Sequence, residues 1–216
     1  MFDTGERNRR SGRSSSGSES DESERPFRRE FSVSGRITRA CGSTTCMEQP
    51  DIAAELSLPG APELLESTSA HLAYVGRDGT PRVVPVGFFW TGEEFVVSTA
   101  TTAPKVGALK ARPEVALAID AGNTPGGARS LSIRGRATVE IVDGVVPEYL
   151  AAARRSMDSE AASQFEQNVR RMYDQMARIA IAPTWVRFYD FGAGRMPRFL
   201  QELAEKSQLT EADWAD

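Results

Sequence analysis

The sequence predicts a mainly β, α+β domain: a six-stranded antiparallel β-barrel with peripheral helices. Short, largely apolar runs recur through the middle of the chain, and the turn dipeptides Asp78-Gly79, Thr91-Gly92 and Asp143-Gly144 separate several of them. Helical spacing of apolar residues follows, before a last strand. Short antiparallel strands joined by hairpins are typical of a small barrel.

The predicted strands follow one another closely along the chain. They are the runs AHLAYV, TPRVVPVGFFW, EEFVVSTA, EVALAID, RSLSIRGRATVEIV and APTWVRFYDF. In the second run, alternation places Phe88 and Trp90 on one face and Phe89 on the other. These aromatic side chains fit the wall of a ligand pocket, and core packing explains them equally well.

Helices are expected around and between the strands. A short helix is expected within residues 51–69, broken at the sequence PGAP, and another from Pro104 until Pro113 ends it. Two more are expected in residues 145–157 and 160–181, followed after the last strand by a loop and a polar C-terminus. The apolar stripe of the second of these helices is expected to serve packing, and its members are Phe165, Val169, Met172 and Met176.

Residues 1–46 form a leader that contains ten serines, nine arginines and five glycines. This composition buries too little apolar surface to offset the entropy of ordering, so the leader is expected to be disordered. It is either a flexible tail or an over-extended reading frame whose true start is Met47, with a regulatory or docking role as the third interpretation. The folded domain is expected to span residues 47–216.

The composition excludes several classes of function. A net charge of −4 and an isoelectric point near 5.3 argue against a nucleic-acid partner. The chain has no apolar run of about 18 residues and begins without an apolar signal segment, so we expect a cytoplasmic protein without a membrane partner. One histidine, His71, and two cysteines, Cys41 and Cys46, make a metal site and a disulfide framework improbable.

His71 also limits the catalytic chemistry. It is expected to be a strand residue with a satisfied hydrogen bond, and Ser-His-Asp catalysis is excluded unless His71 is itself the base. No acid–base pair stands out elsewhere, so no catalytic residue is assigned.

Hydroxyl groups and a lysine gather in the segment STATTAPK, residues 98–105. The chain has only three lysines, and two of them, Lys105 and Lys110, lie in or just after this segment. A strand that ends in Ser98-Thr99, a threonine-rich turn and a helix N-terminus with a positive charge are the parts of a phosphate site. The alternative is that Thr101 or Thr102 only caps the helix.

The order of these features resembles the pyridoxamine 5′-phosphate oxidase-like family of flavin-binding split β-barrels. The residues that carry the resemblance read RVVPVGFFW, then VVSTATTAPKVGALKARPEVALAID, then RSLSIRGRATV. The resemblance extends from about His71 to Arg198 and is densest between Arg82 and Val139. It implies a split barrel that forms an isologous homodimer with a site at each end of the interface.

The resemblance also implies which residues bind the cofactor. The flavin ring and ribityl chain would lie along the strand that contains Arg82, Val83, Val84, Pro85, Val86 and Gly87. The phosphate would lie at Thr99 and Lys105, beside Ser98. The region containing Tyr189, Arg195 and Arg198 would complete the site from the second subunit.

Three positions depart from the pattern of the oxidases. Pro104 stands where an arginine is frequent, Ser130 where a glutamine commonly faces the flavin, and Pro197 where the oxidases place a histidine that holds pyridoxine phosphate. Since His71 is the only histidine, the resemblance does not extend to oxidation of pyridoxine phosphate.

The function expected from the sequence is therefore an oxidoreductase that uses FMN, or alternatively the deazaflavin coenzyme, on a small, planar molecule that is not identified. The cofactor would carry the hydride chemistry, while the protein supplies the pocket and the phosphate anchor. The alternatives are a non-catalytic module that binds flavin or haem, and an empty barrel that acts as a dimeric interaction protein.

Overall fold

Seven antiparallel strands form one sheet in the structure of this chain, a computed structural model that describes residues 46–207. The spatial order is β2-β1-β5-β6-β7-β4-β3. The strands are β1 (Ser69–Val75), β2 (Pro81–Gly87), β3 (Phe89–Trp90), β4 (Phe95–Ala100), β5 (Glu114–Ala121), β6 (Arg129–Asp143) and β7 (Gln175–Asp190). The helices around them are α1 (Gln49–Leu56), α2 (Ala61–Leu65), α3 (Pro104–Ala111), α4 (Pro147–Arg154), α5 (Ser159–Met172) and α6 (Arg198–Ser207).

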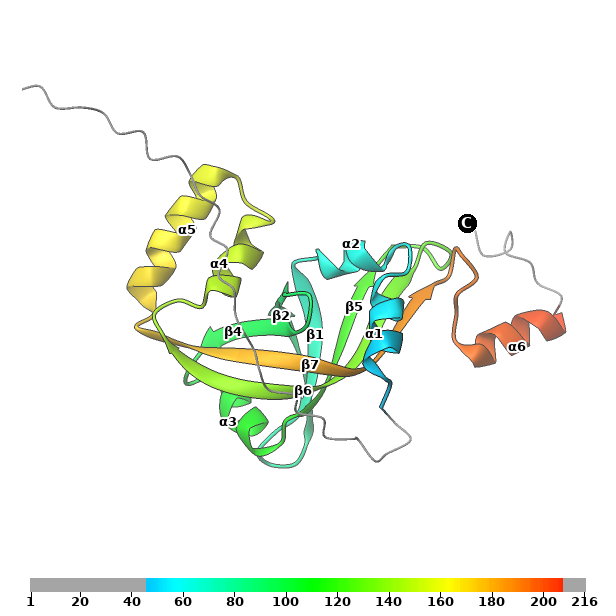
Figure 1. The fold of residues 1–216 in the computed structure, drawn as a ribbon, viewed down its shortest axis with the longest axis horizontal. Coiled ribbons are helices and arrows are strands. Elements are labelled where there is room, and N and C mark those ends of the chain that lie inside the picture. The colour runs from blue at the N-terminus through cyan, green and yellow to red at the C-terminus, as the bar shows by residue number, and fades with distance from the viewer. Residues whose placement is uncertain (1–45, 208–216) are drawn as a thin grey trace, which may run out of the picture. The chain divides into compact units, whose positions relative to one another are not determined.

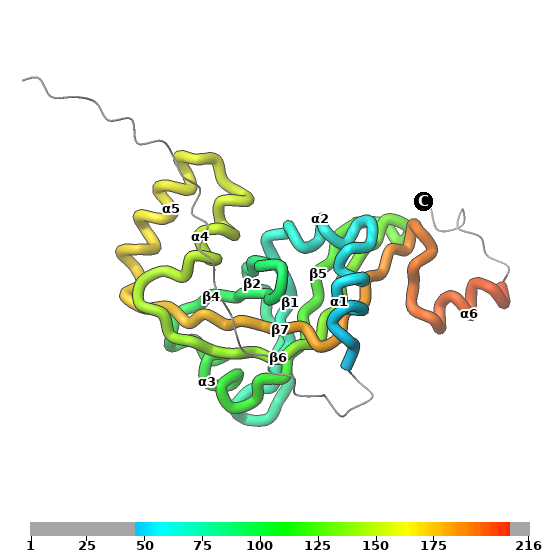
Figure 2. The backbone as a smooth tube through the Cα atoms, viewed as in Figure 1, coloured from blue at the N-terminus to red at the C-terminus, as the bar shows by residue number. Residues whose placement is uncertain are grey.

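The long antiparallel pair of β6 and β7 forms the middle of the sheet, and Figures 1 and 2 show the two strands running side by side. β1, β2 and β5 extend from β6, while β3 and β4 extend from β7. The sheet curls, because β2 on one side contacts β4 on the other. Its inward side chains form the main core, and the largest of them include Leu72, Phe88, Phe95, Ile119, Ile133, Ile181 and Phe188. The predicted split barrel with peripheral helices is confirmed.

The sheet has seven strands rather than the six expected, because the predicted run from 80 to 90 breaks at Phe88. Its first part pairs with β1 as far as Gly87, and its last two residues pair with β4. The Phe88 ring is 1% exposed and lies 5.9 Å from the ring of Phe95 in the core. Burial of this side chain therefore coincides with the point where the chain passes from one side of the barrel to the other.

The three consecutive aromatic residues alternate as predicted. Trp90 lies on the side of Phe88, with its ring 4.4 Å from that of Phe95. Phe89 faces the other way, under the guanidinium of Arg155. Trp90 thus serves core packing, whereas Phe88 both packs in the core and lines a cavity beneath α4.

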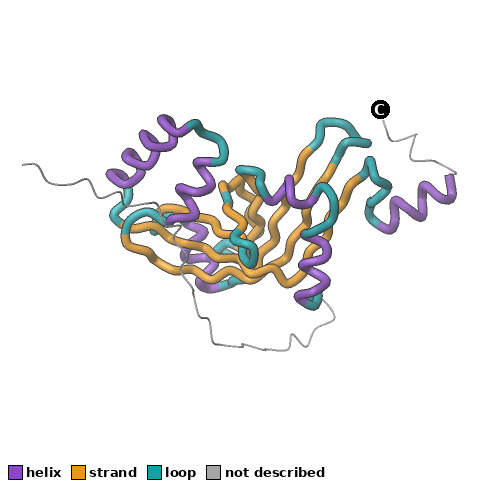
Figure 3. Tube along the Cα trace, turned by 45° about the horizontal axis from the view of Figure 1, so that its top comes forward, coloured by secondary structure: helices purple, strands orange, loops and turns teal. Residues whose placement is uncertain are grey.

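α4 and α5 form a helical hairpin inserted between β6 and β7, as Figures 1 and 3 show. Asp158 begins α5 by accepting a hydrogen bond from the Ala161 N–H at 2.8 Å. The hairpin has a small apolar core of its own, and its buried members are Val145, Val146, Leu150, Val169 and Met176. Two apolar clusters therefore stabilise this domain, one inside the barrel and one beneath the inserted helices.

The predicted helix of residues 160–181 is wrong in its second half. α5 ends at Met172, which is 69% exposed, and Met176 belongs to β7. This part of β7 is buried on both faces, since the barrel core covers one face and the inserted hairpin the other. A strand buried on both faces loses its alternating pattern and cannot be told from a helix by periodicity.

Both ends of the described chain also differ from expectation. α6 forms where a loop and a polar terminus were expected, and it exposes Phe199 and Leu203. Cys46 is disulfide-bonded, although the sequence made a disulfide framework improbable. The predicted disordered leader lies outside the described residues, apart from Cys46 at its end. No helix within residues 46–207 combines the length and the apolar character that a membrane span requires.

Gly135 is predicted to tolerate no side chain. It lies at the bulge between β6 and β7, and a Cβ there would stand 2.7 Å from Ile181 Cγ2 and 2.8 Å from the Ala182 carbonyl oxygen. Gly135→Ala should lower the free energy of unfolding by about 1–3 kcal/mol, measured by urea denaturation. The matched control is Gly107→Ala in α3, where the nearest atom is 3.7 Å away; it should raise stability by about 0.5–1 kcal/mol. Equal effects of the two substitutions would contradict this account of the bulge.

Candidate functional site

The residues predicted to bind a cofactor lie in four places rather than one. The first is a depression beside the β1–β2 hairpin, the second is a cavity beneath α4, and the third is the outward face of the sheet. The fourth is a pocket of about 310 Å³ at the C-terminal loop, which brings together Tyr189, Arg195 and Arg198. β2 connects the first two, because Arg82 lines the depression and Gly87 lines the cavity.

The first place is a depression of about 620 Å³ between the β1–β2 hairpin and α3, which we call the cationic depression. Its polar and charged lining residues are Tyr74, Arg77, Asp78, Arg82, Thr101, Thr102 and Lys110. Three cations therefore face one carboxylate, and hydroxyl groups stand between them. This excess of positive charge suits an anionic ligand.

The threonines of this depression do not cap the helix that follows them. The residue that precedes α3 is Ala103, which provides no side-chain cap, and Pro104 takes the first helical position. Proline suits that position because its missing N–H would have no partner there. The capping interpretation is wrong, and Thr101 and Thr102 instead contribute to the wall of the depression.

Hydrogen bonds fix the hairpin side of the depression. Asp78 accepts hydrogen bonds from the Thr80 N–H at 3.1 Å and from Arg82 at 2.7 Å. These contacts lower the pKa of Asp78 to about 2, and the hydrogen bond from the Thr80 N–H makes the largest contribution. Arg112 donates to the Gly76 carbonyl at 2.8 Å and so ties the hairpin to the end of α3. The Arg82 side chain remains 44% exposed and is available to a ligand.

Thr99 and Lys105 adjoin the cationic depression without lining it. Lys105 lies on the first turn of α3 between Pro104 and Val106, which both line it. Burial lowers the pKa of Lys105, because a charged ammonium is less stable away from water. Thr99 is half-buried near the end of β4. The structure thus brings Arg82 close to the start of α3. Lys105 is the sequence neighbour of two residues that line the cationic depression.

Ser98 belongs to the second place, because neighbouring residues of a strand point to opposite faces. It lines a cavity of about 150 Å³ beneath α4, which we call the α4 cavity. Gly87, at the far end of β2 from Arg82, lines the same cavity.

The third place is the outward face of β2, β1, β5, β6 and β7, which we call the open sheet face. A shallow depression of about 400 Å³ crosses it, and the lining residues that point outward are His71, Ala73, Val83, Ala116, Ala118, Ser132, Arg134, Trp185 and Tyr189. Small side chains occupy its middle strands, and Val83 at its edge is 66% exposed. The face is therefore open, with little to block the approach of a flat surface.

The other predicted residues of β2 and β6 can be placed relative to this face. Val84 and Val86 point inward and pack with the barrel core, so they offer a ligand only their backbone. Pro85 pairs with His71 on the outward side. Ser130 pairs with Tyr189 across β6 and β7, so these two predicted residues are neighbours.

His71 is a strand residue, as predicted, and about half of its side chain is exposed. Its Nδ1 atom lies 3.5 Å from Asp120 Oδ1 on the adjacent strand β5. Within the part of the chain that is described, no three His, Cys, Asp or Glu side chains are grouped so that they could hold a metal ion.

Arg195 has a structural partner that the sequence did not indicate. Its guanidinium donates to Glu55 of α1 at 2.6 Å and to the Phe188 carbonyl at 2.8 Å. Glu55 is 7% exposed and also accepts from Arg187 at 2.7 Å and from the Phe188 N–H at 2.9 Å. This single carboxylate therefore joins α1, β7 and the C-terminal loop. Arg198 differs, since it is 90% exposed and pairs with Glu202 one turn along α6.

Sequence reasoning missed Arg77 in the cationic depression and Glu55 beneath the C-terminal loop, and it noted Lys110 without assigning it to the site. Its position next to the Asp78-Gly79 turn was the only feature of the sequence that could have indicated a role for Arg77. Nothing in the sequence pairs Glu55 with Arg195, because 140 positions separate them along the chain.

The sequence matches the model of the family described as pyridoxamine 5′-phosphate oxidase over residues 61–190. This match covers more than half of the chain and includes every strand. The chain therefore belongs to this family, which confirms the resemblance.

Three solved structures that resemble this chain belong to proteins with different descriptions. A conserved hypothetical protein from Mycobacterium tuberculosis is 22% identical, with 70% of this chain and 90% of that chain covered and a TM-score of 0.48. A protein described as F420 reductase is 29% identical, with coverages of 59% and 96% and a TM-score of 0.45. A haem-binding protein from Mycobacterium smegmatis is 22% identical, with coverages of 64% and 57% and a TM-score of 0.44. A comparison with curated proteins finds no match.

Glu55 is predicted to stabilise the fold in a pH-dependent way. Burial opposes its ionisation most strongly, but the hydrogen bonds from Phe188, Arg195 and Arg187 together outweigh burial and lower its pKa. Its stabilisation is thus complete above the ordinary glutamate pKa of about 4.3 and is lost as the pH falls through the lowered value. Glu55→Gln should reduce the free energy of unfolding by about 1–3 kcal/mol at pH 7, and this difference should shrink in acid.

Denaturation of both proteins from pH 7 to pH 3 measures this effect. The matched control is Glu166→Gln on α5, whose partners Arg154 and Arg170 are largely exposed, so its effect should be much smaller. A difference between wild type and Glu55→Gln that stays constant down to pH 3 would show that the charge of Glu55 is not what stabilises this contact.

Proposed function

We propose that this protein is an oxidoreductase that binds FMN, or alternatively the deazaflavin coenzyme, and acts as a homodimer on a small molecule. The observation that carries the proposal is the cationic depression at the start of β2, in a chain that belongs to the pyridoxamine 5′-phosphate oxidase family. Both cofactors carry a phosphate group, and this depression sets three basic residues against one carboxylate.

The residues of the depression fit a phosphate group. Arg77, Arg82 and Lys110 offset its negative charge, and the hydroxyl groups of Thr101 and Thr102 can donate hydrogen bonds to its oxygens. The N-terminal turn of α3 adds a positive dipole end at the wall. This donor set does not depend on an arginine at Pro104, so the departure from the oxidase pattern leaves an anion site in place.

β2 leads from this site to the region where a ring would lie. Its residues rise about 3.4 Å each, so Gly87 lies about 17 Å from Arg82. A cofactor anchored by its phosphate at Arg82 would extend along β2 toward Gly87. The sequence resemblance implies the same course.

The cofactor supplies the hydride chemistry when it is bound. The chain's own contribution is to bind the phosphate, to orient the molecule along β2 and to shield one side of it from water with the barrel wall. A site that works by positioning needs no acid–base pair of its own.

A homodimer would complete the site. Tyr189 lies on β7, four strand spacings from β2, which is about 19 Å. Arg195 and Arg198 follow beyond Tyr189, so within one chain none of the three is beside β2. A second copy packed on the open sheet face could bring its C-terminal residues to β2. The small side chains of Ala116, Ala118 and Ser132 suit such close packing.

A non-catalytic module that carries flavin or haem is the second candidate. The observation that favours it is the position of His71 on the open sheet face, half-exposed and in the same depression as Trp185 and Tyr189. Neutral imidazole is a common haem ligand. Titration with haem, followed by its absorbance, separates this candidate from the first, as does turnover with a reduced nicotinamide or reduced deazaflavin.

Cofactor affinity is predicted to depend on the charges around the depression. Arg82→Ala and Lys110→Ala should each weaken binding of the preferred cofactor by about 10- to 100-fold, since each removes a charge-assisted contact to phosphate. Titration of the full chain with FMN and, separately, with the deazaflavin coenzyme measures this by fluorescence. Lys206→Ala on α6 is the matched control and should bind as wild type does. Unchanged affinity in both site variants would contradict the proposed anchor.

The dimer is predicted to depend on the open sheet face. Ala118→Glu places a charge in the middle of this face, so it should shift the protein to monomers in size-exclusion chromatography with light scattering. Thr138→Glu, at an exposed position of β6 beyond Gly135, is the control and should leave the assembly unchanged. A dimer that survives Ala118→Glu would show that the two copies meet elsewhere.

A further inference from the structure

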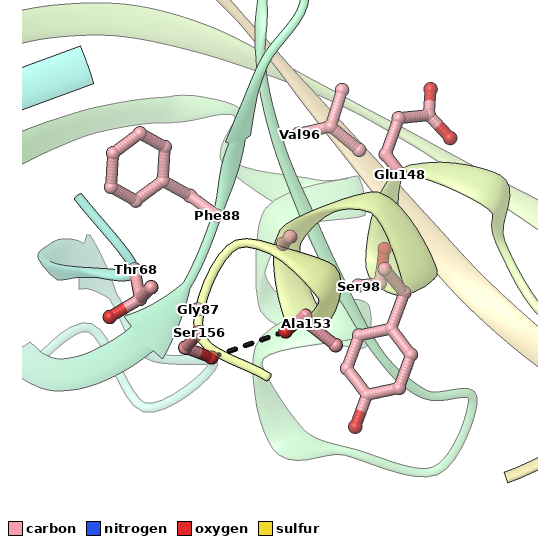
Figure 4. A pocket seen from close by; sticks show the side chains of 10 residues that line it. Thr68, Gly87, Phe88, Val96, Ser98, Glu148, Ala153 and Ser156 are labelled. Carbon is pink, nitrogen blue, oxygen red and sulfur yellow. Dashed lines mark hydrogen bonds between the residues drawn. The ribbon is translucent and has the colours of Figure 1, made fainter. Parts of the chain in front are cut away.

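The α4 cavity lies between the inserted helical hairpin and the barrel wall, outside the barrel core. Val96 and Ser98 of β4 line one side, Gly87 at the end of β2 and the following Phe88 line another, and α4 contributes Glu148 and Ala153, as Figure 4 shows. Its volume is about 150 Å³.

The walls of this cavity are mainly apolar. Phe88, Val96, Ala152 and Ala153 contribute only carbon atoms from their side chains. Among the side chains that the structure describes, Ser98 Oγ is a buried polar atom without a hydrogen-bond partner. Such atoms are rare in folded proteins and usually find a partner in a water or a ligand. The hydroxyl groups of Thr68, Tyr149 and Ser156 also line the cavity, so what distinguishes Ser98 Oγ is that it is buried and has no partner there.

The single carboxylate at the cavity is already neutralised. Glu148 accepts two hydrogen bonds from Arg178, at 2.9 and 2.7 Å, through the same oxygen atom. Since no other charged side chain lines the cavity, a ligand there meets no net charge. A neutral molecule fits this surface better than an ion, because an ion would lose its hydration without gaining a partner.

The volume restricts the ligand further. An apolar protein cavity of about 150 Å³ can hold benzene, whereas drug-sized ligands occupy about 300–1,000 Å³. The cavity is thus large enough for one ring and too small for the three fused rings of a flavin.

We propose that the α4 cavity binds a neutral molecule of one ring with a single hydrogen-bonding group, held by Ser98 Oγ. Gly87 belongs both to this cavity and to the end of β2 opposite the cationic depression. A ring bound beneath α4 would therefore lie next to the end of a cofactor that extends along β2. The further assignment of the cavity as the substrate pocket rests on the proposed function, whereas the binding itself does not.

Phenol and toluene are the probes, added to the full chain labelled with ¹³C at its alanine methyl groups. Both rings should shift the methyl signals of Ala152 and Ala153 through their ring currents and leave that of Ala151, on the same helix but outside the cavity, unchanged. Phenol should bind more tightly than toluene, because only phenol can bond to Ser98. No shift at Ala152 and Ala153 with either probe would mean that the cavity holds water only, and the proposal would be wrong.

Two variants identify the groups responsible. Ser98→Ala should weaken phenol binding by about three- to tenfold and leave toluene binding within about twofold of wild type, since a neutral hydrogen bond is lost. Ala153→Leu should fill the cavity and abolish the shift of the Ala152 methyl signal with either probe, while Ala151→Leu serves as the matched control and should preserve that shift. Equal losses of phenol and toluene affinity in Ser98→Ala would overturn the role of the hydroxyl group.

The same variants distinguish this proposal from the proposed function. Ala153→Leu leaves the cationic depression intact, so it should bind FMN or the deazaflavin coenzyme as wild type does. Phenol binding to a chain that binds neither cofactor would support the cavity and overturn only its role as a substrate pocket. Cofactor binding without any effect of phenol or toluene would overturn the cavity and leave the proposed function standing.

Discussion

The structure depends on one constraint: the single apolar run of residues 80–90 pairs with β1 at one side of the sheet and with β4 at the other. β2 ends at Gly87 while still paired with β1, and two residues later the chain pairs with β4. Burial of Phe88 between these strands fixes the crossing, because its ring packs on Phe95 in the barrel core. The sheet must therefore curl, and both candidate ligand sites on β2 follow from this geometry.

The charges of the molecule separate into two groups with different roles. Glu55 holds Arg187 and Arg195, and these contacts join α1 to the C-terminal loop. Buried in this way, the carboxylate satisfies a backbone N–H as well as two guanidinium groups, so it serves the fold. Around the cationic depression, by contrast, only Asp78 offsets the positive charge of three basic residues. This imbalance leaves an attraction for an external anion, which is the basis of the proposed cofactor site.

The inserted hairpin of α4 and α5 gives this barrel an additional feature. It packs around its own apolar cluster and contacts the barrel through polar and charged side chains of α4 and the turn that follows. Glu148 bonds to Arg178 on β7, while Arg155 donates to the Leu65 carbonyl and stands over the Phe89 ring. Between these contacts the side chains of α4 and the barrel do not fill the space, and the α4 cavity remains. Ser98, predicted as part of a phosphate site, lies here instead, because its strand neighbour Thr99 faces the other way.

Local pattern and turn chemistry determined much of this protein from sequence alone: the hairpin at Asp78-Gly79, the helix that starts at Pro104, the alternation of Phe88, Phe89 and Trp90, and the family to which the chain belongs. Those features depend on neighbouring residues, so the sequence carries them directly. Only the tertiary structure decided that the helix ending at Met172 gives way to β7, since burial on both faces hides the strand period. Contacts between distant segments, such as Glu55 with Arg195 and Arg77 with α3, likewise exist only once the sheet has brought them together.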